Sequence, residues 1–340
     1  MKVSFIIPVY NCKAFLPDCV SSIRSAGFPD YEILLIDDGS TDGSGMLCDK
    51  LASSFSEIRV VHQLNSGVSA TRNRGIREAS GELLLFIDAD DSIAPDLLKK
   101  LLTDTRCTQA DLVCFGISFD YYKRGKLYRQ DALYHPFDGI FTKAQWGDAL
   151  FELFSNNSLS SSCTKIFRKD ILQQHNLLFN EEMFLYEDLE FVLRYLQHCD
   201  RIWNVPQAIY HYRQTEDEGN AKRRLMRIDS LPQFLQPIEA ALTGLAKTNP
   251  TITQEQVQQI LQQLYLVLAR EKIAVSDIDT IQTICRDYQI WSENRLLSNE
   301  RNRFQELLLE GKANLLWLLS KYTRVRHWIA VWVKSLLNLM

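Results

Sequence analysis

The chain has 340 residues, of which 46% are hydrophobic and 24% are charged, and its formal net charge is −4. A chain of this length can bury a sizeable core, as one large domain with a smaller appendage, and its ordinary composition excludes an intrinsically disordered protein. The slightly negative net charge excludes a globally basic surface of the kind that attracts nucleic acid, so we expect no nucleic-acid partner.

Short strands and helices alternate over the segment that precedes Asp88. Val3–Val9 is a continuous apolar run, which is typical of a parallel strand buried on both faces. The predicted strands are Val3–Val9, Glu32–Ile36, Ile58–His62 and Leu83–Ile87, and the predicted helices are Ala14–Ala26, a segment from Thr41 or Asp42 to Phe55, and Ser66–Ala79. Such units require right-handed crossovers and a parallel sheet, and ligands bind these sheets beyond the carboxyl ends of the strands.

The pattern changes from Asp111 onward. The predicted elements are a strand at Asp111–Phe119, a hairpin or another excursion at Tyr121–Tyr134, helices at Lys143–Phe154 and Glu187–Gln197, and a strand at Ile202–Tyr212. Beyond Lys222 the sequence is typical of helices as far as its end. The predicted fold class is therefore α/β, with a mostly parallel central sheet followed by a helical C-terminal region.

Three aspartates follow directly after the predicted strand Leu83–Ile87. Asp88, Asp90 and Asp91 fall within four residues, so their carboxylates repel one another unless a positive charge lies among them. A hard divalent cation such as Mg²⁺ or Mn²⁺ takes oxygen ligands and leaves coordination places for phosphate oxygens. The alternative is a turn or a helix cap, above all for Asp91.

A second acidic cluster, Asp37 and Asp38, closes the predicted strand Glu32–Ile36. The alternative reading is a glycine-containing turn and a helix cap, but Thr41 or Asp42 can supply the cap alone. The adjacent aspartates then have no structural purpose, whereas a carboxylate at this edge can accept hydrogen bonds from a base N–H or from ribose hydroxyls.

The segment Asn65–Asn73 contains a third cluster. In the structural interpretation, Ser66 or Ser69 caps a helix and the arginines of that helix are solvated. Arg72 lies on the turn nearest the carboxyl edge of the predicted sheet, where a guanidinium can pair with a phosphate or stack on a nucleobase.

Four motifs together resemble those of glycosyltransferase family 2, whose members have the GT-A fold. They occur in the order and spacing typical of that family, and they are Phe5–Asn11, Ile36–Asp42, Asn65–Asn73 and Ile87–Asp91. The resemblance covers residues 1–215 and implies a GT-A catalytic domain, with a nucleotide-binding half at 1–110, an acceptor-side half at 111–215 and a helical region at 216–340. It also implies an inverting enzyme that uses a nucleoside-diphosphate sugar, usually a UDP-sugar, with Mn²⁺ or Mg²⁺.

The resemblance assigns roles to individual positions of this sequence. The positions that match the uridine site are Pro8, Tyr10, Asp38 and Arg72, with Asp37 and Asn65 as secondary candidates. Asp88 matches the position that contacts the ribose, and Asp90 matches the metal ligand of the D-x-D motif. Asp91 can assist either role, so the candidate metal ligands are Asp90, Asp88 and Asp91.

Glu187 and Asp188 begin a predicted amphipathic helix. Acidic residues in a first helical turn interact favourably with the helix dipole, which is their structural explanation. The pair also resembles the Glu-Asp pair of the family, whose aspartate deprotonates the acceptor hydroxyl. We therefore predict Asp188 as the general base, with Glu187 as the second candidate.

Three more positions lie in two segments that resemble family segments, Cys163–Arg168 and Tyr210–Arg213. Arg213, in Tyr210–Arg213, matches an arginine that helps to hold the diphosphate, although the serine that often follows is missing from Gln214–Asn220. His211 is either a third metal ligand or a packed or exposed side chain. Lys165 matches a segment that we place near the acceptor side.

The last part of the sequence, residues 312–340, is basic and rich in leucine and tryptophan, with no acidic residue. No apolar stretch in it is long enough to span a membrane. A basic amphipathic helix of this kind favours peripheral contact with an anionic inner leaflet, and the alternative is packing on the catalytic domain or on a second subunit of a homo-oligomer. Because the sequence opens without a secretory signal pattern, we expect a cytoplasmic protein, with the inner membrane face as the site of any peripheral contact.

The predicted function is transfer of a sugar from a nucleotide-sugar donor to a hydroxyl of a carbohydrate or lipid-linked saccharide acceptor, in bacterial surface polysaccharide synthesis. One alternative is a non-catalytic scaffold protein that binds nucleotide sugars. A metal-dependent nucleotidyltransferase is a further alternative, but such an enzyme usually has a glycine-rich basic loop after its first strand, and Pro8–Cys12 is not one.

Overall fold

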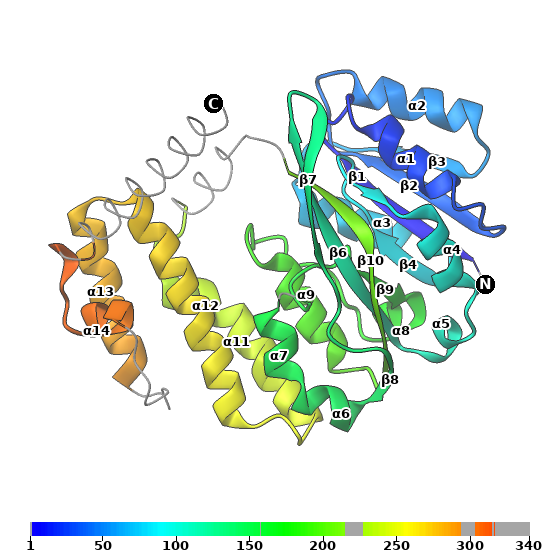
Figure 1. Ribbon diagram of the computed structural model, residues 1–340. Coiled ribbons are helices and arrows are strands. Elements are labelled where there is room, and N and C mark those ends of the chain that lie inside the picture. Colours follow the sequence, from blue (N-terminus) through cyan, green and yellow to red (C-terminus); the bar gives the residue numbers. More distant parts are fainter. Residues whose placement is uncertain (1, 157, 215–226, 294–302, 315, 317–340) are drawn as a thin grey trace, which may run out of the picture. The chain divides into compact units, whose positions relative to one another are not determined.

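The computed structural model describes residues 2–156, 158–214, 227–293, 303–314 and 316 (Figure 1). The chain forms two compact units, one of residues 1–216 with 241–252 and the other of residues 217–240 with 253–340. The first unit is an α/β domain and the second is helical.

Within the described residues, ten strands form a single sheet (Figure 1). The strands are β1 (Val3–Val9), β2 (Tyr31–Asp37), β3 (Ile58–His62), β4 (Leu83–Phe86), β5 (Ser92–Ile93), β6 (Leu112–Lys123), β7 (Lys126–Leu133), β8 (Gly139–Thr142), β9 (Lys165–Arg168) and β10 (Arg201–Gln214). Their order is β3-β2-β1-β4-β9-β6-β10-β5, with β7 beside β6 and β8 beside β10.

The sheet is mostly parallel, as the sequence predicts. Strands β1 to β4 run parallel, and β9 is antiparallel to both of its neighbours, β4 and β6. Strand β6 therefore points the same way as β4, and β10 is parallel to β6. The carboxyl ends of β1, β2, β4 and β10 consequently lie at one edge of the sheet, which is where ligands bind in such folds.

Helices cover both faces of this sheet. They are α1 (Leu16–Arg24), α2 (Ser44–Ser54), α3 (Val68–Glu78), α4 (Pro95–Thr103), α5 (Arg106–Gln109), α6 (Lys143–Asp148), α7 (Leu150–Ser155), α8 (Lys169–Gln174), α9 (Glu187–Leu196) and the last part of α11 (Leu231–Thr248). Helix α4 contacts both α1 and α5, and these three helices lie across the sheet from α9 (Figure 1).

Helices α3 and α9 share one face of the sheet. Ile6 and Phe86 are neighbours on β1 and β4, so their side chains point to the same side. Gly75 of α3 lies against Ile6, and Phe191 of α9 packs edge-on against Phe86. A Cβ atom at Gly75 would lie 2.2 Å from Cγ2 of Ile6, so only glycine lets α3 approach β1 this closely.

The predicted helix Lys143–Phe154 was wrong in one respect, because it is divided into α6 and α7. Asn249 Nδ2 and Thr251 Oγ1 donate hydrogen bonds to the carbonyl oxygens of Lys143 and Ala144. Side chains far along the chain thus bind carbonyl oxygens in the first turn of α6.

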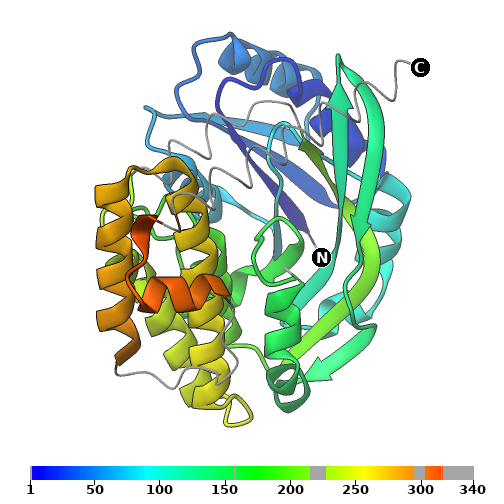
Figure 2. The same cartoon turned by 60° about the vertical axis from the view of Figure 1, so that its left-hand side comes forward.

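The second unit consists of the first part of α11 with α12 (Gln254–Val275), α13 (Ile278–Glu293) and α14 (Arg303–Leu309). Helices α12 and α13 lie side by side (Figure 2), and their core contains the rings of Tyr265, Tyr288 and Trp291, with centroids 4.8–5.9 Å apart. Of the described helices, none combines the length and apolar character needed to cross a membrane. The predicted amphipathic tail at 312–340 lies outside the described residues, except for 312–314 and 316.

Candidate active site

The carboxylate of Asp38 organises the loop that precedes α3. Its oxygens accept hydrogen bonds from the backbone N–H groups of Ser66 (2.8 Å) and Gly67 (2.9 Å) and from Nε2 of Gln63 (2.8 Å). Asn65 Nδ2 donates to the main-chain oxygen of Asp38 at 3.1 Å. Asp38 is buried, so its carboxylate holds this loop in place and faces protein donors, where the sequence led us to expect a uridine contact.

Asp37 is occupied in a similar way. It accepts the backbone N–H of Ser40 at 3.1 Å, and its second oxygen lies 2.9 Å from Nδ1 of His62. Hydrogen bonds to Asp37 and then Asp49 raise the pKa of His62, which favours the imidazolium form. Of the residues predicted to contact uridine at the end of β1, Pro8 is half-buried and the side chain of Tyr10 is 50% exposed. These two therefore remain as candidates for direct contact.

Arg72 of α3 is a buried cation at this edge, at 3% exposure. Its Nη1 lies 2.7 Å from Oδ1 of Asp188 and 4.0 Å from Glu187, and its Nη2 lies 2.9 Å from Oδ1 of Asp88. Burial lowers the pKa of Arg72, but the charges of Asp188 and Asp88 outweigh it and hold that pKa well above its ordinary value. Arg72 therefore joins two predicted site carboxylates, instead of facing a nucleobase.

Asp91 is bound on both sides by protein donors. Its carboxylate accepts the hydroxyl of Tyr210 at 2.6 Å and the backbone N–H of Arg213 at 2.7 Å. Burial, then the charges of Asp88 and Asp90, raise the pKa of Asp91 to about 8. Asp91 neither caps α4, whose N-cap is Ala94, nor keeps an oxygen free for a cation, so the geometry argues against it as a metal ligand.

Asp88 and Asp90 remain as candidate ligands. Asp88 keeps one carboxylate oxygen that makes no protein hydrogen bond within the described part of the chain, and its side chain is 34% exposed. Burial and the charge of Asp88 raise the pKa of Asp90, which shows that negative charge is crowded here. Among the described residues no three His, Cys, Asp or Glu side chains gather as a metal site. Two hard carboxylates still fit a Mg²⁺ or Mn²⁺ ion that takes its other ligands from a diphosphate and water.

Arg213 lies beside Asp90, one of the two candidate metal ligands. Its Nε donates to the main-chain oxygen of Asp90 at 2.9 Å, and its guanidinium lies 4.1 Å from the ring centroid of Tyr122 and 5.0 Å from that of Phe15. The two rings hold the guanidinium beside Asp90. Arg213 thus lies where an anion near Asp90 can be paired.

Asp188 lies in the first turn of α9, next to the loop that leads to β9. Its Oδ1 is paired with Arg72, whereas Oδ2 accepts only a longer hydrogen bond, 3.2 Å, from the backbone N–H of Ser162 among the described residues. The helix starts after Tyr186, which has a positive φ of 59° and makes no side-chain cap. Asp188 is therefore oriented by a fixed cation and keeps one oxygen that is weakly engaged.

His211 and Lys165 serve other parts of the domain. Nδ1 of His211 lies 3.0 Å from the buried carboxylate of Asp120. Nζ of Lys165 is fully buried and donates to the main-chain oxygens of Ser158 (2.9 Å) and Ser161 (2.6 Å). Lys165 supports the loop beside Asp188 from inside, so its ammonium group is not exposed toward an acceptor.

A model of the Glycosyl transferase family 2 matches residues 4–175 of the sequence. The chain belongs to glycosyl transferase family 2. This confirms the resemblance carried by the four sequence motifs.

Curated relatives support the assignment. The chain is 30% identical over 216 residues to the uncharacterized glycosyltransferase EpsJ of Bacillus subtilis, with 62% of this chain and 61% of EpsJ covered. It is 32% identical over 213 residues to the putative glycosyltransferase EpsH of the same organism, with 62% and 60% covered. The minor teichoic acid biosynthesis protein GgaB of Bacillus subtilis is 28% identical over 223 residues, with 64% of this chain and 23% of GgaB covered. The chain thus spans less than two thirds of the length of each of these relatives.

Solved structures show the same fold. The crystal structure of S. aureus TarS 1-349 in complex with UDP-GlcNAc superposes with a TM-score of 0.62 at 17% identity, covering 95% of this chain and 92% of that chain. The complex of the same TarS fragment with UDP gives a TM-score of 0.57 at 17% identity, with 95% and 91% covered. The GT-A type of fold predicted from the sequence is confirmed.

One structural residue of this family 2 domain was missed by sequence reasoning. Asn73, directly after Arg72, is buried and makes two hydrogen bonds with the backbone of Phe179. Its Nδ2 donates to the carbonyl oxygen of Phe179 (2.9 Å), and its Oδ1 accepts from the N–H of Phe179 (2.7 Å). It also donates to Glu181 at 2.9 Å. Its place beside Arg72 in a recognised motif was the available signal, but its partners lie more than a hundred residues away.

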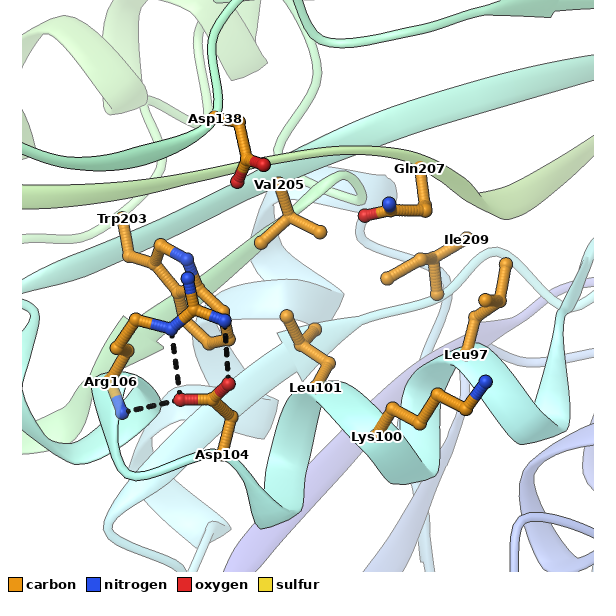
Figure 3. Close-up of a pocket in the computed structure, with 10 residues that line it drawn as sticks. All are labelled: Leu97, Lys100, Leu101, Asp104, Arg106, Asp138, Trp203, Val205, Gln207 and Ile209. Carbon is orange, nitrogen blue, oxygen red and sulfur yellow. Dashed lines mark hydrogen bonds and ion pairs between the residues drawn. The ribbon is translucent and has the colours of Figure 1, made fainter.

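A cavity of about 260 Å³ lies away from these residues, between α4, α5 and β10 (Figure 3). Its walls include the side chains of Leu97, Leu101 and Trp203, and the guanidinium of Arg106 covers the Trp203 ring at 4.6 Å while it pairs with Asp104. None of the predicted site residues lines it.

Proposed function

We propose that this chain is an inverting glycosyltransferase that transfers a sugar from a UDP-sugar to an acceptor hydroxyl. The observation that carries the proposal is the buried guanidinium of Arg72, which joins Asp88 at the end of β4 to Asp188 at the start of α9. The donor-side and acceptor-side carboxylates are thereby fixed at one edge of the sheet. We assign donor binding to the half at 1–110 and acceptor binding to the half at 111–215.

The donor diphosphate would lie between Asp90 and Arg213. Asp90 and the free oxygen of Asp88 are the residues that would hold a divalent metal ion, and such an ion supplies charge stabilisation to a leaving diphosphate. Arg213, held by Tyr122 and Phe15, would pair with phosphate oxygens as negative charge develops on them. Tyr10 and Pro8 would contact the uridine, with Asp38, Asp37 and Asn65 acting through the loops that they hold.

Asp188 would act as general base toward the acceptor hydroxyl. Arg72 fixes its Oδ1, and Oδ2 is available to accept the hydroxyl proton as the new bond to the anomeric carbon forms. Attack on the face opposite the leaving diphosphate inverts the anomeric configuration. Glu187, which lies 4.0 Å from Arg72, is the second candidate.

The acceptor that we propose is a lipid-linked saccharide of a bacterial surface polysaccharide, on the cytoplasmic face of the membrane. Support comes from the relative GgaB, a minor teichoic acid biosynthesis protein, and from the basic, tryptophan-bearing sequence of residues 312–340. Relatives of this kind belong to cell-wall polymer synthesis by name, and fold likeness alone does not set the substrate.

The test is incubation of the full chain with a panel of UDP- and GDP-sugars, Mn²⁺ and short saccharide acceptors. We expect nucleoside diphosphate release coupled to a product whose anomeric configuration, read by NMR, is inverted. Pyrophosphate release would instead identify a nucleotidyltransferase, and donor binding without turnover would identify a scaffold protein.

A pair of variants tests the base. Asp188→Asn should abolish transfer while donor affinity in calorimetry stays within a few-fold of the unaltered chain. Glu182→Gln is the matched control, since Glu182 is an exposed carboxyl six residues earlier in the same part of the chain, and it should transfer normally. Full turnover by Asp188→Asn would place the base elsewhere.

A further inference from the structure

The β6–β7 hairpin carries a basic, tyrosine-rich tip, here called the basic hairpin and defined as residues 121–129. Four of its nine residues are basic and none is acidic, in a chain whose net charge is −4. Its side chains at 123–129 are exposed, with Leu127 44% and Tyr128 62% exposed. Two large apolar side chains among cations at a projecting tip are not explained by packing of the domain.

The basic hairpin stands on the edge of the sheet that carries the candidate active site. Tyr121 on β6 pairs with Gln214, the last described residue of β10, so residues 122–127 extend beyond it (Figure 1). Tyr122 supports the guanidinium of Arg213 at 4.1 Å. The tip is therefore fixed in position relative to the proposed diphosphate site.

A two-residue turn closes the tip. Lys123 pairs with Lys126, and the two residues between them, Arg124 and Gly125, both have positive φ, 50° and 74°. This is the backbone of the two-residue hairpin turn that matches the twist of the strands. The turn thus brings Lys123, Arg124 and Lys126 close together at the end of the hairpin.

Among the described residues, these three cations lack an acidic partner. Arg129 is paired with Asp131, but Lys123, Arg124 and Lys126 have no ion-pair partner in the part of the chain that the structure describes. Close like charges on a short ribbon repel one another, so an external anion would stabilise them.

We propose that the basic hairpin is a docking surface for an anionic phospholipid bilayer, which it contacts with Lys123, Arg124 and Lys126 on headgroups and with Leu127 and Tyr128 in the headgroup layer. The apolar pair decides between occupants, because a soluble polyanion offers nothing that gains from burying Leu127, whereas a bilayer interface does. This inference rests on the proposed function in one respect: a lipid-linked acceptor must meet the active-site edge at a membrane. It assigns that contact to the hairpin, independently of residues 312–340.

The test measures binding of the full chain to phosphatidylcholine vesicles with and without phosphatidylglycerol. The first variant combines Lys123→Gln, Arg124→Asn and Lys126→Gln; asparagine is chosen at 124 because it tolerates a positive φ. Its matched control, Lys50→Gln/Arg77→Gln/Lys99→Gln, removes the same charge from exposed sites on three helices. We expect the hairpin variant to lose about 100-fold in affinity for the anionic vesicles and the control to keep its affinity.

A second variant, Leu127→Ser/Tyr128→Ser, separates the two occupants. It should weaken binding to anionic vesicles but leave binding to soluble polyphosphate unchanged. The proposal is overturned if the charge variant binds vesicles like the unaltered chain, or if the serine variant keeps full vesicle affinity. Nucleoside diphosphate release in solution should be the same in every variant. If the unaltered chain binds vesicles but transfers no sugar, only the proposed function is contradicted.

Discussion

Nη1 of Arg72 lies 2.7 Å from Oδ1 of Asp188, although 116 residues separate the two in the sequence. The same guanidinium reaches Asp88 with its other nitrogen, at 2.9 Å. A planar fork with donors on both arms can hold two carboxylates in fixed directions, which a single ammonium cannot do. The orientation of the proposed base is thus set from the nucleotide-binding half of the domain.

Replacing Arg72 tests this arrangement. Arg72→Met leaves the carboxylates of Asp88 and Asp188 without their cation, and we expect the free energy of unfolding to fall by about 3 kcal/mol, the lower end for a broken buried pair because both carboxylates keep contact with solvent. Arg72→Lys keeps the charge but not the fork, so kcat should fall at least ~10-fold with a smaller stability loss. Urea denaturation and initial rates measure both. Equal kcat in Arg72→Lys and the unaltered chain would contradict the orienting role.

Removing one hydroxyl tests the support beneath the acidic cluster. Tyr210 donates to Asp91 at 2.6 Å and accepts from the backbone N–H of Asp88 at 3.1 Å. Tyr210→Phe should lower the free energy of unfolding by about 1–3 kcal/mol and should also lower kcat, because Asp88 shifts. Tyr195→Phe is the control, since this buried hydroxyl also makes two hydrogen bonds, with Arg168 and Asp111, but away from the site. Tyr195→Phe should lose stability and keep its kcat. A normal kcat in Tyr210→Phe would show that the Tyr210 hydroxyl does not support the candidate site.

The close approach of α3 to β1 gives a packing prediction. Gly75→Ala places a methyl group 2.2 Å from Cγ2 of Ile6, and overpacking of this kind costs about 1–3 kcal/mol. In a double-mutant cycle with Ile6→Ala, the two changes should be less harmful together than their sum, by about 0.5–3 kcal/mol. Denaturant titration of the four proteins gives the coupling. Additive effects would show that α3 relaxes away from β1.

Much of the fold followed from local pattern. The apolar run Val3–Val9 was predicted because a strand buried on both faces has a local signature. The helix predicted at Ser66–Ala79 is present as Val68–Glu78, but the expected serine cap was wrong, because Gly67 is the N-cap and no side chain caps the helix. Strand β9 was not predicted, since its four residues begin with Lys165 and end with Arg168 and carry no periodicity. Its place between β4 and β6 is decided by tertiary pairing, which also buries the lysine.

The strand ends indicated which residues form the candidate site, but no local pattern gave the hydrogen bonds and ion pairs that these residues make. Asp38 was expected to face a ligand, yet its partner Ser66 lies 28 residues away on a loop whose path no local pattern gives. Asp91 likewise meets Tyr210 from 119 residues away. An aspartate that binds a ligand and one that holds a loop look alike in sequence, because the difference lies in long-range donors.

Acid unfolding should depend on Glu32, a carboxylate buried on β2 far from the candidate site. Burial raises its pKa, but hydrogen bonds from Ser4, the Ser80 backbone and Arg59 outweigh this and lower the pKa of Glu32 to about 2. Because the folded pKa lies below the ordinary value near 4.5, its contribution to stability is complete above about pH 4.5. It should be lost as the pH falls toward 2.

The measurement is the free energy of unfolding of the unaltered chain and of Glu32→Gln over that pH range. At neutral pH the variant should be less stable by about 2–3 kcal/mol, and the gap should close on acidification, because the protonated glutamic acid and the glutamine are then both neutral. Glu82→Gln serves as a control at an exposed carboxyl just before β4, and its stability should follow that of the unaltered chain at each pH. A gap between Glu32→Gln and the unaltered chain that stays constant down to pH 2 would mean that Glu32 stabilises the fold by shape, with its charge playing no part.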